Sequence, residues 1–232
     1  MTTVHLLCAG AAQGLVRALE DRLRAELGIT LASTFGAVGA MKEALQGGAA
    51  CDVMVVTAAM VDTLIAEGRL LAGSSAPLGR VRTGVAVRKG DPVPPVDSSE
   101  ALRQTLLAAD VIYFPDPQRA TAGIHFENVV RELGIFEAVQ TRFRTFPSGA
   151  IAMRELAAAT SPHPIGCTQI TEINYTPGLT LAGPLPQPFE LATVYTAAIG
   201  AHAAEPEAAA RLVALLCGST SQALRAGGGF EL

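Results

Sequence analysis

The 232-residue sequence contains no tryptophan, few aromatic residues and no long apolar run. A membrane-spanning helix requires about 18 or more consecutive apolar residues, so no membrane insertion is expected. Clusters of basic residues are missing as well, because 17 Lys and Arg are scattered among 21 acidic residues and the formal net charge is -4. Nucleic-acid-binding surfaces concentrate positive charge, and a nucleic-acid partner is therefore not expected.

Cysteine is also scarce. The four cysteines lie far apart, none belongs to a Cys-x-x-Cys pair, and each has apolar neighbours: Cys8, Cys51, Cys167 and Cys217. This pattern predicts buried free thiols rather than metal ligands, and it does not require an oxidising compartment. We expect neither a metal site nor a cofactor.

The common catalytic and nucleotide-binding motifs do not occur: there is no P-loop, Gly-x-Gly-x-x-Gly, Gly-x-Ser-x-Gly or His-Glu-x-x-His. Cys8 falls inside an expected strand and is a poor candidate for a nucleophile. His125 begins an expected helix after a loop, so His125 and Asp116 are the acid/base candidates if the protein is an enzyme. The alternative for His125 is a histidine at a helix start that binds water or a nearby carboxylate.

The apolar opening, residues 4–15, raises the question of an export signal. Such a signal has a positively charged region before its apolar stretch, whereas the first basic residue here is Arg17, after the apolar run. As given, the chain is expected to be cytoplasmic. It would be periplasmic if a signal peptide had been removed from its start.

Apolar residues are abundant, at 50%, and they form short runs that alternate with helical patterns. Leu15, Leu19, Leu23 and Leu27 recur at every fourth position, which predicts a helix over residues 12–27 that ends at glycine 28. The order of strand, small-residue turn and helix returns along the chain. Strands are expected at 4–8, 29–35, 51–56, 111–114, 142–146, 165–169 and 193–200. This alternation predicts an α/β protein with mostly parallel sheets flanked by helices.

The sequence changes character in "RTGVAVRKGDPVPPVDSS", residues 82–99, where an expected strand with alternating valines runs into a charged, proline-rich connection. A crossing between lobes is expected here, near residues 80–90. A second proline-rich stretch near residues 184–196 precedes the last expected strand. We therefore expect two lobes with crossover segments at these places. The first lobe would comprise residues 1–82 with 196–232, and the second would comprise residues 83–195.

Small residues gather in three expected turns between strands and helices, at 9–13, 34–39 and 147–150. A fourth turn, at 116–123, adds Arg119 and Thr121. At the carboxyl ends of parallel strands, the free N–H groups and the dipoles of helix N-termini favour an anion, and small residues let the backbone approach it. The alternative is that these glycines serve only the tight turns of an α/β fold.

The order of elements and several motifs resemble the molybdate-binding-protein family, the solute receptors of ABC transporters with the type II periplasmic-binding-protein fold. The matching segments are "VHLLCAGAAQGLVRALEDRL", "TFGAVGAMKEALQGGAACDVMV", "TAGIHFENVVRELGI" and "PIGCTQITE". The resemblance covers nearly the whole chain and implies two α/β lobes that clamp a ligand in the cleft between them. It implies an ABC transporter as partner only if the protein is exported. The wider family includes aconitate isomerase, which shifts a double bond in a tricarboxylic acid.

Departures from the family's pattern change the expected ligand. Molybdate receptors place serine hydroxyls in the first two turns and a tyrosine on a late strand. The matching positions here are about Ala11, Val38 or Gly39, and Gln169. Each polar contact left unmade costs about 1–3 kcal/mol, so tight molybdate binding is not expected.

An organic acid fits the remaining donors better, because a guanidinium binds a planar carboxylate through two parallel hydrogen bonds. Arg119 is the candidate for this clamp, and the alternative is a solvated loop charge. The other expected ligand-binding residues are Gly10, Ala11, Gln13, Thr34, Gly36, Val38, Thr121, Ser148, Gly149 and Gln169. The sequence thus predicts binding of a di- or tricarboxylate. Two alternatives stay open: a cytoplasmic aconitate-isomerase-like enzyme, and a molybdate-type oxyanion receptor.

Overall fold

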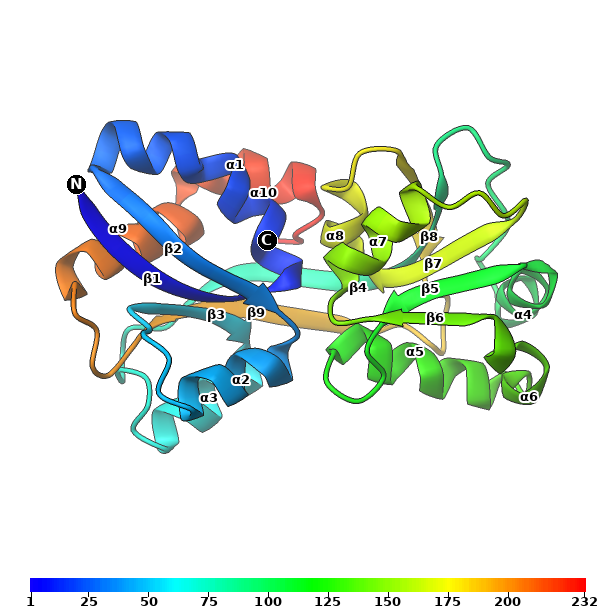
Figure 1. Cartoon of the computed structure of the whole chain (residues 1–232), viewed down its shortest axis with the longest axis horizontal. Helices are drawn as coiled ribbons and strands as arrows, with labels where there is room; N and C mark the ends of the chain where they lie inside the picture. The colour runs from blue at the N-terminus through cyan, green and yellow to red at the C-terminus, as the bar shows by residue number, and fades with distance from the viewer. The chain divides into compact units, whose positions relative to one another are not determined.

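A computed structural model describes the whole chain, residues 1–232. The chain forms two compact units (Figure 1). Unit 1 comprises Met1–Val81 and Thr193–Leu232, and unit 2 comprises Arg82–Ala192. The chain leaves unit 1 within strand β4 (Ala76–Arg88) and returns at the start of strand β9 (Ala192–Ile199).

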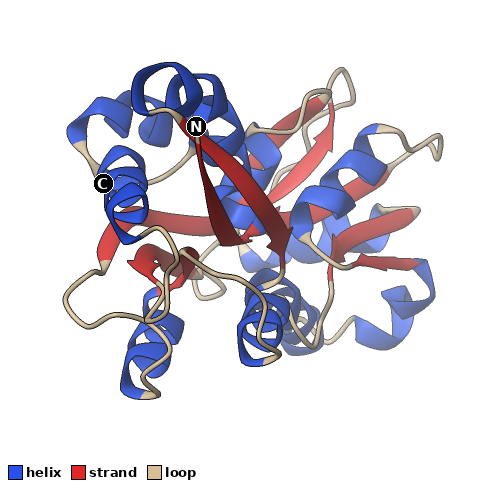
Figure 2. Ribbon diagram, turned by 60° about the vertical axis from the view of Figure 1, so that its left-hand side comes forward, coloured by secondary structure: helices blue, strands red, loops and turns tan.

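The sheet of unit 1 has the order β2-β1-β3-β9. Strands β1 (Thr2–Ala9), β2 (Ile29–Gly36) and β3 (Val53–Thr57) are parallel, and β9 is antiparallel to β3. Helices lie on both faces of this sheet (Figures 1 and 2). One face carries α1 (Gly10–Leu27), α9 (Pro206–Cys217) and α10 (Gln222–Gly228), and the other carries α2 (Val38–Gln46) and α3 (Ala58–Ala66). A short 3-10 turn, Ser219–Ser221, joins α9 to α10.

The sheet of unit 2 has the order β4-β7-β5-β6, with β8 (Leu179–Pro184) paired to β4. Strand β5 (Val111–Pro115) is parallel to β6 (Phe143–Phe146) and β7 (Pro164–Gln169), whereas β4 is antiparallel to β7 and β8. One face carries α4 (Ser99–Ala108), α5 (Thr121–Glu132) and α6 (Phe136–Val139); the other carries α7 (Gly149–Ala157) and α8 (Ile170–Asn174). A 3-10 turn, Gln140–Arg142, follows α6.

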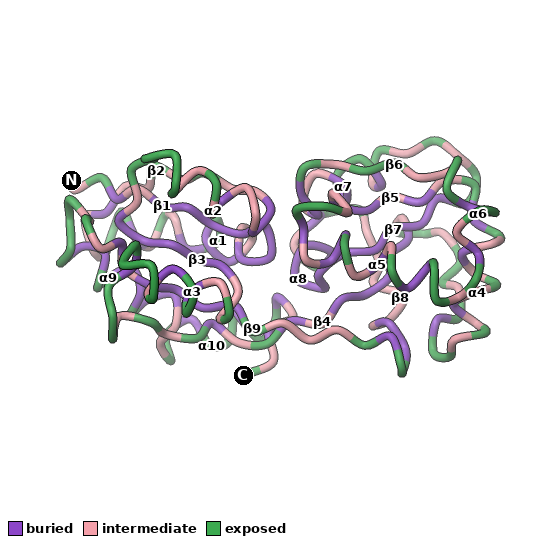
Figure 3. Tube along the Cα trace, turned by 90° about the horizontal axis from the view of Figure 1, so that it is seen from below, coloured by how far each residue is buried: buried purple, intermediate pink, exposed green.

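The apolar pattern of the sequence accounts for these layers. Leu15, Leu19 and Leu23 of α1 are fully buried, and α1 ends where Gly28 takes a left-handed conformation with φ +63°. In unit 2, Leu102 of α4 and Phe126 of α5 pack into one core. The central strands of both units are buried along much of their length (Figure 3). The repeated strand-and-helix order is therefore confirmed.

Two details differ from the sequence prediction. Helix α1 begins at Gly10, so residues 10–13, expected as a turn, form its first turn, and the small residues pack closely against the sheet. Strand β8 was not predicted, because its six residues are all only half-buried and show no alternation of exposed and buried positions. Each sheet also contains antiparallel strands beside its parallel ones: β9 in unit 1, and β4, which runs antiparallel to β7 and β8, in unit 2.

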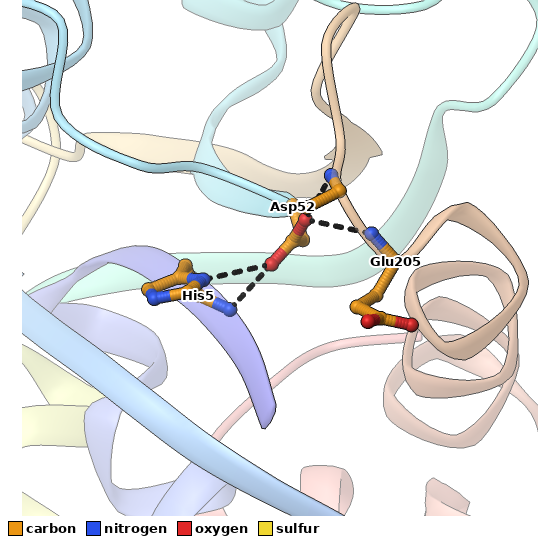
Figure 4. A network of polar contacts seen from close by, with 4 residues as sticks. His5, Asp52 and Glu205 are labelled. Atoms are coloured by element: carbon orange, nitrogen blue, oxygen red, sulfur yellow. Dashed lines mark hydrogen bonds and ion pairs between the residues drawn. The ribbon is translucent and has the colours of Figure 1, made fainter. Parts of the chain in front are cut away.

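A buried carboxylate joins distant segments of unit 1 (Figure 4). Asp52, which is 1% exposed, accepts a 2.7 Å hydrogen bond from the backbone N–H of His5, and the His5 Nδ1 atom lies 3.1 Å from the same oxygen. Its other oxygen accepts from the backbone N–H groups of Ala204 and Glu205, at 2.7 and 3.2 Å. Burial raises the pKa of Asp52, but these hydrogen bonds outweigh burial and hold that pKa below its ordinary value.

The four cysteines are free thiols. Cys8 and Cys167 are buried as predicted, and burial raises the pKa of each thiol well above its ordinary range. Cys51 and Cys217 are only partly buried. No helix of the structure is both long enough and apolar enough to cross a membrane.

Candidate functional site

The carboxyl ends of three parallel strands meet at one edge of unit 1. Ala9, at the end of β1, pairs in register with Gly36, at the end of β2. Helices α1, α2 and α3 begin at this edge, directly after β1, β2 and β3. The N-cap residues of α1 and α2 are Ala9 and Ala37, which have no side-chain atom that accepts a hydrogen bond. These helices therefore start with N–H groups that their own caps leave unbound.

The predicted residues of unit 1 lie close to this edge, with one exception. Gly10 and Ala11 are buried in the first turn of α1, and Gln13 is half-buried in the same helix. Gly36 ends β2 and Val38 begins α2. Thr34 instead pairs with Leu7, two residues before the strand ends, and its side chain is exposed.

Sequence reasoning missed Thr57 at the same edge. Its side chain caps α3 by accepting a 3.3 Å hydrogen bond from the Met60 N–H. The signal was present, because a threonine between a buried strand and a helix is a typical N-cap. The start of α3 thus has an internal acceptor that the starts of α1 and α2 lack.

In unit 2, the parallel strands β5, β6 and β7 end at one edge, where α5, α7 and α8 begin. Thr121 is the first residue of α5, whose N-cap, Ala120, makes no side-chain hydrogen bond. Arg119 lies exposed in the preceding loop. Asp116 shapes this loop, since its Oδ1 atom accepts from the N–H groups of Gln118 and Arg119 at 2.7 and 3.2 Å.

The structure places the two acid/base candidates in different surroundings. The His125 Nε2 atom lies 2.8 Å from the carbonyl oxygen of Phe189. A carbonyl only accepts hydrogen bonds, so Nε2 carries the proton and Nδ1 is the basic atom of neutral His125. The Asp116 carboxylate is held by backbone N–H groups of its own loop. Any proton transfer would use His125 Nδ1 or the free lone pairs of Asp116.

The start of α7 contains an internal carboxylate that the sequence did not reveal. Ser148 is the N-cap and accepts a 3.3 Å hydrogen bond from the Ile151 N–H, while the Ala150 N–H donates to Glu172 Oε1 at 3.1 Å. The other Glu172 oxygen accepts from the Thr168 hydroxyl. A Cβ atom on Gly149 would overlap Glu172 Oε2 and Thr168 Oγ1. Ser148 and Gly149 therefore lie at the start of α7, where the Glu172 carboxylate already accepts a hydrogen bond from the Ala150 N–H group.

Burial raises the pKa of Glu172 to about 7, although hydrogen bonds from Thr168 and from the Ala150 and Gln169 N–H groups lower it. Glu172 is thus a carboxyl group at these helix starts with a pKa raised to near neutrality. Perturbed carboxyl groups of this kind gather at functional sites, and they also occur in structural networks.

Glu172 makes the stability of the protein depend on pH. Its folded-state pKa of about 7 exceeds the ordinary 4.5, so the proton favours the folded state below pH 4.5 and this contribution is lost as the pH rises through 7. We expect the free energy of unfolding to fall by about 3 kcal/mol more in the native protein than in Glu172→Gln between pH 4.5 and 8. Urea unfolding at several pH values measures this difference. Glu155→Gln, at an exposed position of α7, is the control. If the free energy of unfolding changes with pH equally in the native protein and in Glu172→Gln, the prediction is wrong.

Comparisons with known proteins agree with this architecture. The sequence model of a family described as bacterial extracellular solute-binding protein matches residues 4–231. The periplasmic molybdate-binding protein of Azotobacter vinelandii is 19% identical with a TM-score of 0.82, and each chain is 99% covered. The sulfate-binding protein SubI of Mycobacterium tuberculosis is 15% identical with a TM-score of 0.70, covering 99% of this chain and 86% of that one.

A curated relative is an enzyme. The aconitate isomerase of a Pseudomonas species is 26% identical over 225 residues, which cover 93% of this chain and 82% of the relative. The chain belongs to the bacterial extracellular solute-binding protein family. The predicted resemblance to molybdate-binding-like proteins and the two-lobe type II fold are both confirmed.

Proposed function

We propose that the protein binds a small organic anion, a di- or tricarboxylate, at helix starts that no side chain caps. One observation carries the proposal: α1, α2 and α5 each begin after a parallel strand with alanine as N-cap and no side-chain hydrogen bond. Alanine is a poor N-cap. By contrast α4, which begins elsewhere in unit 2, is capped by the Ser98 hydroxyl. Uncapped N–H groups and the helix dipoles favour a bound anion.

The side chains near these helix starts support an organic acid over a metal oxide. Ala11 and Val38 carry no hydroxyl to donate to a tetrahedral oxyanion. Arg119 and Thr121, in contrast, supply a guanidinium and a hydroxyl suited to a planar carboxylate. Gly10, Gly36, Ser148 and Gly149 would contribute N–H groups, with Gln13, Thr34 and Gln169 as further polar contacts.

Isothermal titration calorimetry with citrate, trans-aconitate, cis-aconitate, succinate, molybdate and sulfate tests the proposal. At least one of the organic acids is expected to bind at least about 100-fold more tightly than molybdate, because several oxyanion contacts of about 1–3 kcal/mol each are missing. Tighter binding of molybdate or sulfate would overturn the organic-acid proposal in favour of an oxyanion receptor.

Arg119→Ala is expected to weaken binding of the preferred acid by about 10- to 100-fold, since charge-assisted hydrogen bonds contribute about 1.5–3 kcal/mol. Arg103→Ala is the matched control, because Arg103 is a surface arginine of the same unit whose guanidinium faces Glu100 on α4. Calorimetry of both variants measures the effect. Unchanged affinity in Arg119→Ala would exclude Arg119 from the site.

The second candidate function is an isomerase that shifts a double bond in a tricarboxylic acid. The 26% identity to aconitate isomerase over most of the chain favours it. His125 or Asp116 would remove and return the carbon-bound proton, and the helix starts would hold the carboxylates. Proton NMR of cis- and trans-aconitate in heavy water distinguishes the two functions. Deuterium incorporation or a moved double bond identifies an enzyme, whereas binding without chemical change identifies a receptor.

The two functions imply different places of action. A receptor would work outside the cytoplasmic membrane and deliver its ligand to an ABC transporter, whereas an isomerase of soluble metabolites would work in the cytoplasm. Fractionation of cells that express the complete gene, followed by immunodetection of the protein, separates these cases.

A further inference from the structure

Unmet hydrogen-bonding groups concentrate at one place in unit 2. Of eight buried side-chain nitrogen and oxygen atoms without a hydrogen-bond partner in the protein, four belong to Thr83, Gln169 and Thr171. These residues are 1%, 2% and 0% exposed. Both the nitrogen and the oxygen of the Gln169 amide are among them. An unpaired buried polar atom costs about 1–3 kcal/mol, and folded proteins keep few of them.

Thr83 and Gln169 are direct neighbours across the sheet. They pair in the antiparallel register of β4 and β7, so their side chains project from the same face. Gln169 is the last residue of β7, at the edge where α5 and α7 begin, and antiparallel pairing brings Thr83 to that edge. The two residues therefore belong to the part of unit 2 that carries the proposed anion site.

The strand alternation also fixes the face on which they lie. Cys167 lies two positions before Gln169 on β7, and Val85 lies two positions after Thr83 on β4. Both pack into the core that contains Phe126 of α5. Side chains two residues apart share a face of the sheet. Thr83 and Gln169 thus lie on the α5 face, toward the start of a helix whose N-cap, Ala120, makes no side-chain hydrogen bond.

The chemistry of this pair selects a particular ligand group. The Gln169 amide offers two donors and an acceptor, and the Thr83 hydroxyl offers one donor and accepts as well. An ionised carboxylate or a sulfate dianion has acceptors only and leaves the Gln169 oxygen unpaired. A ligand hydroxyl donates to that oxygen and accepts from the amide nitrogen or from Thr83. One ligand hydroxyl group can therefore bind both an acceptor and a donor of this residue pair.

We propose that Thr83 and Gln169 form a subsite for a hydroxyl group, so that the bound anion is a hydroxycarboxylate. The inference rests on the proposed anion-binding function and narrows its ligand class. The adjacent carboxylate of such an acid binds the uncapped N–H groups of α5 and the Arg119 side chain.

Matched pairs of acids that differ by one hydroxyl test the subsite: malate against succinate, and citrate against tricarballylate. By calorimetry, the native protein is expected to bind the hydroxylated member of at least one pair 10- to 100-fold more tightly. Gln169→Leu and Thr83→Val are expected to bring that ratio below about 3 while changing the affinity for the deoxy acid little. Thr176→Val is the control, because the buried Thr176 hydroxyl already donates to the Glu172 carbonyl.

The folding of the variants gives an independent readout. Because Thr83→Val removes an unpaired buried hydroxyl, the ligand-free variant is expected to unfold at a higher urea concentration than the native protein. A lower midpoint would show that the hydroxyl has a partner within the fold and would overturn the proposal. Equal binding of both members of each pair would also overturn it. If no acid of either pair binds, the proposed anion-binding function itself fails.

Discussion

Asp52→Ala is expected to lower the free energy of unfolding by about 3–5 kcal/mol, because three backbone N–H groups lose a buried acceptor at once. The donors belong to β1 and to the segment that leads into α9, so the carboxylate joins the start of the chain to its last third. Urea unfolding at pH 7 measures the loss.

The Asp52 carboxylate also makes the free energy of unfolding depend on pH. The pKa of Asp52 is depressed in the folded protein, so its contribution to stability is present above its ordinary pKa of 3.8 and lost as the pH falls through the folded value. The difference in stability between native protein and Asp52→Ala should therefore shrink in acid. Glu205→Ala is the control, since Glu205 contributes only its backbone N–H (Figure 4). A loss below about 1 kcal/mol in Asp52→Ala would show that other groups bind these donors.

Gly149→Ala is expected to have the second largest effect, lowering the free energy of unfolding by about 3 kcal/mol and weakening anion binding. The added methyl group overlaps the Glu172 carboxylate and the Thr168 hydroxyl. Both groups are buried and bound to each other, so neither moves aside easily. The start of α7 must shift instead, and with it Ser148 and the first N–H groups of the helix.

Gly227→Ala provides the matched control, because a Cβ at this helical position of α10 meets no atom within 4 Å. It is expected to be neutral or to stabilise by up to about 1 kcal/mol. Urea unfolding and calorimetry with the preferred acid measure both variants. If Gly149→Ala loses stability and still binds the acid with native affinity, α7 does not belong to the anion site.

The fold followed from local patterns in the sequence. The four-residue leucine spacing located α1, and the alternation of apolar runs with helical patterns predicted α/β units. The prediction failed where local signals were weak. Small residues at 10–12 were interpreted as a turn because glycine and alanine suit both a turn and a closely packed first helical turn. Strand β8, LTLAGP, has no fully buried residue and alternates apolar and polar residues only over its first three positions, which is too short a pattern to predict a strand.

The candidate site, too, was predicted from the sequence only in part. The helix starts at residues 9–13 and 147–150 follow their strands directly in the sequence, so reading along the chain located these segments, although the first was interpreted as a turn. Glu172, Thr168 and Thr83 were missed, because their surroundings arise from segments far apart in the sequence. The β4–β7 register places Thr83 beside Gln169, and the packing of α7 against α8 buries Glu172. A burial-raised pKa has no local sequence signal.

The alanine N-caps of α1, α2 and α5 imply a trade-off between the empty and the occupied protein. Serine or threonine at these positions would strengthen each helix by about 1 kcal/mol but would compete with the ligand for the same N–H groups. Under the proposed function, the empty protein gives up helix stability at these positions, and the bound acid would restore it. A compound that binds these helix starts is expected to raise the melting temperature by an amount that grows with the logarithm of its concentration above its Kd, which makes thermal-shift screening of small acids a direct search for the ligand.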